Sequence, residues 1–243
     1  MAASPSPSPK RADESHFAPQ PIPVRHQSAN ACTERSHGAA KRHHPHKPVT
    51  SREKSGLAPA SYAGIADFNG DGYEDLFLSQ NFYPTAVGIP RFDTGRGLLL
   101  LGDGSGSLAP MSGATSGILV YGDQRGAAYA DLDHDGRLDL AVSQNGGATR
   151  LFRNHLAKPG LRVRVQGSVT NPDGIGVQMR IVYGDHMGPV REIAAGSGYW
   201  SQNGAVQVFG LAGTPIAVWV RWPGGAVSRV PLPKGAREVV VRR

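Results

Sequence analysis

The chain has 243 residues, of which 39% are apolar, and it is rich in glycine (32) and proline (19). This length is enough for one large or two small domains, and the glycines and prolines predict frequent turns. The formal net charge is +7, but residues 1–60 hold nine Lys or Arg against four Asp or Glu, whereas residues 61–243 hold seventeen against fifteen, or +2. The larger part is nearly neutral and lacks the basic surface whose counterion release drives nucleic-acid binding. We therefore expect no nucleic-acid partner.

Residues 1–60 differ in composition from the rest of the chain. They contain nine Pro, eight Ser and six of the nine His, with almost no aliphatic periodicity. Such a segment cannot bury enough apolar surface to offset the entropy of ordering, so we expect a disordered basic tail. The cluster His43–His46 has the chemistry to hold a transition metal, but a solvated tail is the favoured interpretation. The first ten residues lack the apolar segment of a signal peptide, and no apolar run approaches the roughly 18 residues of a transmembrane helix.

From Tyr62 onward, short apolar runs alternate with Gly- and Asp-rich turns, which is typical of an all-β protein. An apolar run, an Asp/Gly loop and a second apolar run occur over residues 61–79 and again over residues 127–143. The first loop aspartates are 131 − 67 = 64 residues apart, and such self-similarity indicates a repeat architecture. Further strands are expected at residues 97–101 and 118–121. Four strands per period is the content of a propeller blade, although two blades alone cannot close a propeller.

The two Asp-rich loops place oxygen-bearing groups at matching positions. Side chains at positions one, three, five and nine, with the backbone carbonyl at position seven, can wrap one calcium ion, which takes six to eight oxygen ligands. The expected ligands are Asp67, Asn69, Asp71, the Tyr73 carbonyl and Asp75 in loop one, and Asp131, Asp133, Asp135, the Arg137 carbonyl and Asp139 in loop two. Gly72 and Gly136 at position six permit the sharp turn. Loop two has four carboxylates against three, so we expect it to bind Ca²⁺ more tightly.

Two other interpretations of these loops are weaker. An EF-hand begins with the same pattern but needs a bidentate Glu at position twelve and an exiting helix. Position twelve is Leu78 or Val142, and each loop runs into an alternating strand, so a β-hairpin is predicted. Mg²⁺ fits less well because an all-protein loop suits the larger ion. Asp/Gly turns also form without metal, but four ligand positions repeated in register favour calcium.

After Asn154 the Asp loops stop, and a second series of predicted strands follows an expected linker at residues 158–160. These strands are expected at residues 161–166, 175–183, 190–194, 206–209, 216–222 and 238–241. In the fifth, alternation separates Val218, Val220 and Trp222 from Trp219 and Arg221. Core packing is the favoured role of the aromatic residues near loops, namely Phe82, Tyr83, Tyr199, Trp200 and Trp219. The alternative for Trp219 is stacking on a sugar or a protein partner.

The repeated segments resemble FG-GAP/VCBS repeats, whose calcium loops lie in blades of integrin-α-type β-propellers. Asp123-Gln-Arg-Gly126 before loop two, with Asn145 and Leu151-Phe-Arg-Asn154 after it, strengthen this resemblance. The C-terminal part resembles an ASPIC/UnbV domain through the segments Asn171-Pro-Asp-Gly-Ile-Gly176, Gly198-Tyr-Trp-Ser-Gln-Asn203, Phe209-Gly-Leu211 and Val220-Arg-Trp-Pro-Gly-Gly225. Repeats followed by this domain are similar to the arrangement of the cartilage acidic protein family and its bacterial relatives.

This resemblance implies a partial β-propeller of two FG-GAP-type repeats over residues 61–157 and a small C-terminal β-domain over residues 158–243, behind the tail of residues 1–60. It also implies a Ca²⁺-binding protein that is extracellular, on the cell surface or periplasmic, and that binds an extracellular protein or polysaccharide. Such propellers have about seven blades, and an exported protein needs a signal peptide. We therefore also expect the chain to be the C-terminal part of a longer coding sequence.

Catalysis is not expected from this sequence. After residue 60 the histidines are His134, His155 and His186, and none lies beside a Gly-x-Ser-x-Gly nucleophile elbow. The acidic residues are spaced for an ion rather than for the two carboxylates of a glycosidase. The sequence therefore predicts a calcium-binding recognition or adhesion module. The alternatives are a non-catalytic accessory domain of an exported enzyme and a purely structural fragment without a ligand.

Overall fold

The first Asp-rich loop lies in a four-stranded antiparallel sheet. The computed structural model describes residues 14–17 and 58–243. The sheet has the order β2-β3-β4-β5, with β2 Ala60–Ala66, β3 Asp75–Gln80, β4 Leu98–Gly102 and β5 Leu108–Met111. Loop one joins β2 to β3, which pair in antiparallel register. The prediction that this loop closes a β-hairpin is confirmed.

A second sheet repeats this arrangement. It has the order β1-β8-β7-β6, with β1 Glu14–Phe17, β6 Asp123–Ala130, β7 Asp139–Asn145 and β8 Gly147–Asn154. Loop two joins the antiparallel strands β6 and β7, while β1 pairs in parallel with the edge of β8. Strand β1 falls within the expected disordered tail of residues 1–60. Most of that tail, including the cluster His43–His46, lies outside the described residues.

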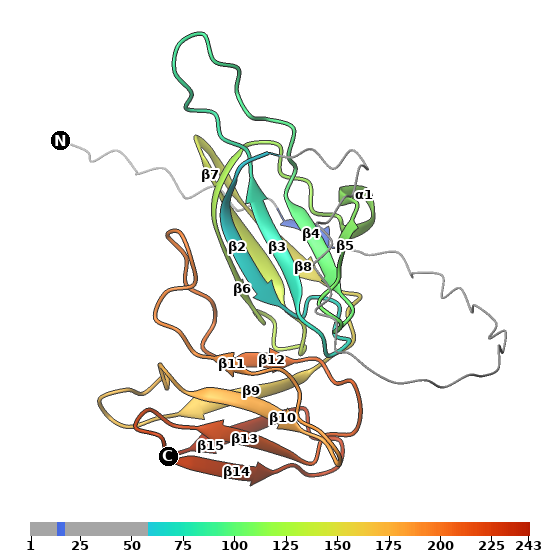
Figure 1. Cartoon of the computed structure of the whole chain (residues 1–243), viewed down its shortest axis with the longest axis vertical. Coiled ribbons are helices and arrows are strands. Elements are labelled where there is room, and N and C mark those ends of the chain that lie inside the picture. The colour runs from blue at the N-terminus through green and yellow to red at the C-terminus, as the bar shows by residue number, and fades with distance from the viewer. Residues whose placement is uncertain (1–13, 18–57) are drawn as a thin grey trace, which may run out of the picture.

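The two sheets pack face to face, and neither closes on itself (Figure 1). Phe77 and Leu99 of the first sheet and Leu140, Val142 and Phe152 of the second belong to one buried cluster. Strand alternation sends these side chains to the facing surfaces of the two sheets. The arrangement agrees with a partial propeller of two blades, as the repeat pattern predicts.

Residues after the linker form two further sheets with a core of their own. One has the order β12-β9-β15 and the other β11-β10-β13-β14. Their strands are β9 Leu161–Gln166, β10 Gln178–Val182, β11 Arg191–Glu192, β12 Gln207–Phe209, β13 Ala217–Arg221, β14 Val227–Pro231 and β15 Glu238–Arg242. Val218, Val220 and Trp222 are buried while Trp219 and Arg221 are not, so the predicted alternation is confirmed. Within the described residues, no helix has the length and apolar character to cross a membrane.

Some local predictions are wrong. Residues 118–121 form no strand, although Ile118 and Val120 are buried. Their alternation reflects burial against the core, because the preceding short helix α1 Gly113–Ser116 turns the chain away from the sheet. The fourth strand of the first sheet is instead β5, which contains Pro110 and pairs only with β4. Proline cannot donate to a ladder and is tolerated on such an edge.

Three aromatic predictions also fail. Core packing is the favoured role of Phe82, Tyr199 and Trp200 in the sequence, yet these side chains are 37%, 47% and 87% exposed. The rings of Tyr199 and Trp200 stack on each other, with centroids 5.2 Å apart. A Tyr-Trp pair within a Gly- and Ser-rich segment forms the outside of a loop here rather than part of a strand.

Candidate metal centre

The two Asp loops have the same backbone geometry. Positions four and six have positive φ in both: 74° and 96° at Gly70 and Gly72, and 64° and 82° at His134 and Gly136. In loop one a β-carbon at Gly70 would lie 2.2 Å from the carbonyl oxygen of Lys158, so only glycine fits. In loop two the same position is exposed and accepts a histidine, although positive φ is unfavourable for that residue.

The aspartate at position one organises each loop. Asp67 Oδ2 accepts the amide of Gly72 at 2.8 Å, and Asp131 Oδ2 accepts the amide of Gly136 at 3.1 Å. The other carboxylate oxygen of Asp131 accepts the amide of Asp135 at 3.0 Å. These hydrogen bonds fold the loop backbone around the carboxylate, while Asp67 Oδ2 accepts a single amide.

The aspartate at position nine fastens each loop to a neighbouring strand. Asp75 is 1% exposed and accepts the amide of Gly102 from β4 at 2.9 Å. Asp139 is 2% exposed and accepts the amide of Asn154 at the end of β8, also at 2.9 Å. Each carboxylate also accepts an amide from inside its own loop. The structure thus gives these two predicted ligands an architectural role in the hairpins.

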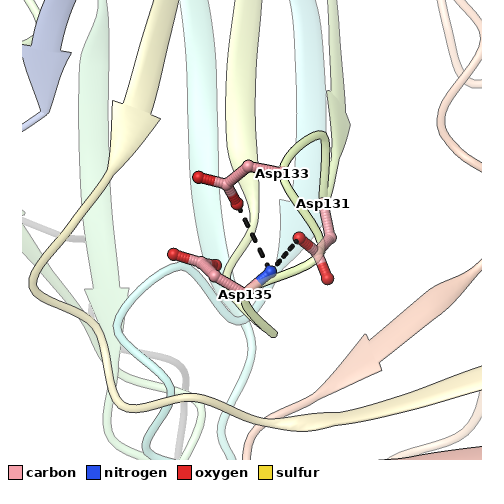
Figure 2. A group of neighbouring side chains, drawn as sticks. All are labelled: Asp131, Asp133 and Asp135. Carbon is pink, nitrogen blue, oxygen red and sulfur yellow. Dashed lines mark hydrogen bonds between the residues drawn. The ribbon is translucent and has the colours of Figure 1, made fainter.

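Three carboxylates of loop two converge. Asp131, Asp133 and Asp135 each offer an oxygen, and these oxygens lie within 4.8 Å of one another. Figure 2 shows the three carboxyl groups around the amide nitrogen of Asp135, which donates to Asp131 at 3.0 Å and to Asp133 at 3.3 Å. Asp139 is not part of this cluster. Carboxylate oxygens at this spacing suit a hard divalent cation.

Arginine side chains surround the loop-two cluster. Each aspartate has one arginine partner, and the nitrogen–oxygen distances are 2.6 Å for Arg162–Asp131, 2.6 Å for Arg153–Asp133 and 2.7 Å for Arg137–Asp135. Arg162 also pairs with Glu238, so its positive charge is shared between two carboxylates. The sequence pattern assigns a role to the carbonyl of Arg137 but none to these side chains. Arg153 lies in the segment Leu151-Phe-Arg-Asn154 after the loop, which is the one sequence signal that pointed towards it.

Loop one has a different ligand arrangement. Asn69 replaces the second aspartate, and its amide nitrogen donates to Asp71 Oδ2 at 2.9 Å. Among the described residues, the loop-one carboxylates do not form a three-carboxylate cluster like that of loop two. Burial raises the pKa of Asp67 to about 6 and the pKa of Asp75 to about 7, because desolvation outweighs the amide hydrogen bonds. A bound cation would favour the charged forms of both groups.

Both loops lie at the junction with the C-terminal strands. In the linker, the amide of Lys158 donates to the carbonyl of Asn69 at 3.3 Å, and that of Gly160 donates to the carbonyl of Gly136 at 2.8 Å. On β11, Arg191 forms an ion pair of 2.9 Å with Glu74 of loop one. Rigidity of the loops is therefore coupled to the position of the C-terminal unit.

The fold and the loops define an all-β repeat protein with a candidate cation site at the three carboxylates of loop two. Comparison with protein-family models gives two matches: an FG-GAP-like repeat over residues 67–142, and ASPIC and UnbV over residues 167–243. The chain thus combines FG-GAP-like repeats with a C-terminal ASPIC and UnbV domain, in the order that its motifs predict. Comparison with curated proteins gives no match.

Proposed function

We propose that this chain is a calcium-binding, non-catalytic recognition or adhesion module of an exported protein. The observation that carries the proposal is the convergence of Asp131, Asp133 and Asp135 within 4.8 Å. Loop one, with the same turn geometry, supplies the second site. The FG-GAP-like match over both loops supports an extracellular or surface location. The ligand is an extracellular protein or polysaccharide.

The donor set fits calcium in each loop. Asp67, Asn69 and Asp71 offer two carboxylates and an amide oxygen in loop one, and the carbonyls of Tyr73 and Arg137 are the proposed backbone ligands. Position-nine carboxylates contribute through the lone pairs that their amide bonds leave free. When bound, the ion supplies two positive charges that offset carboxylate repulsion. Backbone hydrogen bonds of the loops with Lys158 and Gly160 hold the two hairpins against the linker.

Calcium titration by calorimetry tests the proposal. The wild-type chain should give two binding events, Asp135→Ala should lose the loop-two event, and Asp71→Ala should lose the loop-one event. Asp185→Ala is the matched control, because its side chain is 89% exposed and pairs only with His186 among the contacts described. Heat no larger than that of buffer in the wild-type titration would refute the proposal.

A non-catalytic accessory domain of an exported enzyme is the second candidate function. The contact between the Asp loops and the linker favours it, because calcium would then stiffen the connection between two units of one chain. The two candidates differ in ligand binding. Retention of the calcium-loaded chain on immobilised glycans or matrix proteins supports recognition. A chain that is retained on neither supports the accessory role.

A further inference from the structure

A cleft of about 570 Å³ opens where the first sheet meets the C-terminal unit. Aliphatic side chains from both units line it, namely Ile65, Leu76, Leu108, Met187 and Pro189. Three glycines at and after the end of β4 line the same cleft without adding side chains to it. Small-molecule sites have volumes of roughly 300–1,000 Å³ and often lie between domains. The cleft therefore has the size and the position of a small-molecule site.

Arg180 on β10 brings a positive charge to the lining of this cleft. Its Nε donates to the carbonyl of Gly188 at 2.8 Å, and its Nη2 donates to the carbonyl of Met187 at 3.5 Å. A guanidinium has five N–H groups, so 5 − 2 = 3 of them are left without a protein acceptor in the described part of the chain. Among the described residues, no acidic side chain pairs with Arg180. Its charge is therefore available to an anionic ligand.

The two acidic residues of the lining do not cancel this charge. Glu74 forms its ion pair with Arg191 at 2.9 Å, so its negative charge is already compensated. Asp75 is 1% exposed, and its two oxygens accept the backbone amides of Phe68 and Gly102. Neither carboxylate therefore meets the cleft as a free negative charge. The cleft is complementary to a molecule with an apolar body and one anionic group.

We propose that this cleft binds an aliphatic carboxylate of the fatty-acid type, with its carboxylate on Arg180 and its alkyl chain against the aliphatic wall. A guanidinium binds a carboxylate through charge-assisted hydrogen bonds. An alkyl chain gains from leaving water and needs no hydrogen-bond partner, whereas the hydroxyl groups of a sugar would be desolvated against Ile65, Leu76 and Leu108. This ligand differs from the protein or polysaccharide of the proposed function, and its site does not require calcium.

Calorimetry of the full chain with decanoate and with uncharged decanol, both in the presence of chelator, tests the site. The wild-type chain should bind decanoate saturably at a single site, and decanol more weakly. Arg180→Met should weaken decanoate binding by about tenfold or more, the range for a hydrogen bond to a charged group, and should leave decanol binding unchanged. Arg180→Lys should bind decanoate more tightly than Arg180→Met, because it keeps a positive charge.

Arg229→Met is the matched control for the charge. Arg180 and Arg229 are both in register with Trp219, one on each side of β13, so they lie in one row across the same sheet. Arg229 is exposed and does not line the cleft, so its loss should leave decanoate binding unchanged. An equal loss of binding in both arginine variants would show unspecific charge attraction and overturn the proposal. A wild-type chain without saturable decanoate binding would overturn it as well.

A variant of the wall keeps the test decisive if the Arg180 variants fail to fold. Met187 is 45% exposed at the cleft, and Met187→Asp should weaken the binding of both decanoate and decanol, because it places a charge on the apolar wall. Val190→Asp is the control, at a 56% exposed position outside the lining, and should bind both as the wild type does. Unchanged binding by Met187→Asp would place the ligand elsewhere and overturn the proposal. Since chelator is present throughout, the result is independent of calcium binding by the loops.

Discussion

Buried carboxylates determine the chemistry of loop one. Asp67 and Asp75 accept backbone amides that shape the hairpin, yet burial holds the pKa of each well above that of a free aspartate. A metal-free loop therefore carries an electrostatic cost at neutral pH. A bound cation would offset that cost because it would stabilise the charged forms.

This cost predicts a pH-dependent stability of the metal-free chain. The pKa values of about 6 for Asp67 and about 7 for Asp75 exceed the unfolded value of about 3.9, so the folded state binds protons more strongly. Their contribution to stability is present below about pH 4 and is lost as the pH rises through about 7. Urea unfolding with chelator should show this fall. Asp75→Asn should flatten it, and an unchanged slope would contradict the prediction.

The arginines around loop two would compete with a bound cation for the carboxylates that they pair with. Arg153 pairs with Asp133 at 2.6 Å, and the two side chains are 35% and 25% exposed. Since such a pair contributes up to about 1 kcal/mol, Arg153→Gln should tighten calcium binding in loop two by up to about fivefold. Calorimetry measures the change, with Arg229→Gln on β14 as the control. Weaker binding in the variant would show that the arginine helps to assemble the site.

At the scale of elements, each hairpin depends on the segment packed behind it. Loop one lies against residues 210–212, and an added β-carbon at Gly210 would lie 1.8 Å from Asp67 Oδ2. The glycine is therefore required by close approach of two elements that are distant in sequence. Loop two instead contacts Gly160 of the linker through Gly136.

Gly210→Ala should displace loop one and lower the free energy of unfolding by about 1–3 kcal/mol, as expected for overpacking. Gly213→Ala is the matched control, because the nearest atom to its β-carbon is 3.7 Å away. Urea unfolding of both variants measures the difference, and calorimetry should show weaker calcium binding in loop one of the first. Equal stability of the two variants would mean that the segment moves aside freely.

At the scale of the whole molecule, Arg191 connects the two units. It pairs with Glu74 across 117 residues of sequence and stacks over the ring of Phe209. Its side chain is mostly buried, so loss of the partner charge leaves a poorly solvated guanidinium. The junction therefore depends on this ion pair and on that of Arg162 with Asp131, as well as on apolar packing.

Glu74→Gln should lower the unfolding free energy by about 1–3 kcal/mol, the range for a hydrogen bond to a charged group. Glu192→Gln is the control, because this neighbour of Arg191 is exposed and bonds to Gln178 within the C-terminal unit. Chemical unfolding measures both. A larger loss in the control would place the important contact within the C-terminal sheet rather than between the units.

The sequence by itself determined the local features. The hairpin loops, the all-β class and the two family segments follow from patterns a few residues long, because ligand spacing and strand alternation are properties of neighbouring residues. The alternation of buried and exposed side chains in β13 was also predicted from the sequence. The sequence did not show that β5 is a strand and that residues 118–121 are not, because an edge strand and a buried irregular segment differ only in their hydrogen-bond partners.

Only the tertiary structure decided the partners of those features. Arginine has a long side chain, and the sequence does not say which of many arginines reaches Asp133 or Glu74; the observed partners lie 20 and 117 residues away. Alternation likewise gives β3 two apolar faces without saying which one is covered. That choice depends on how the second sheet and the C-terminal unit pack, which is a property of the folded chain as a whole.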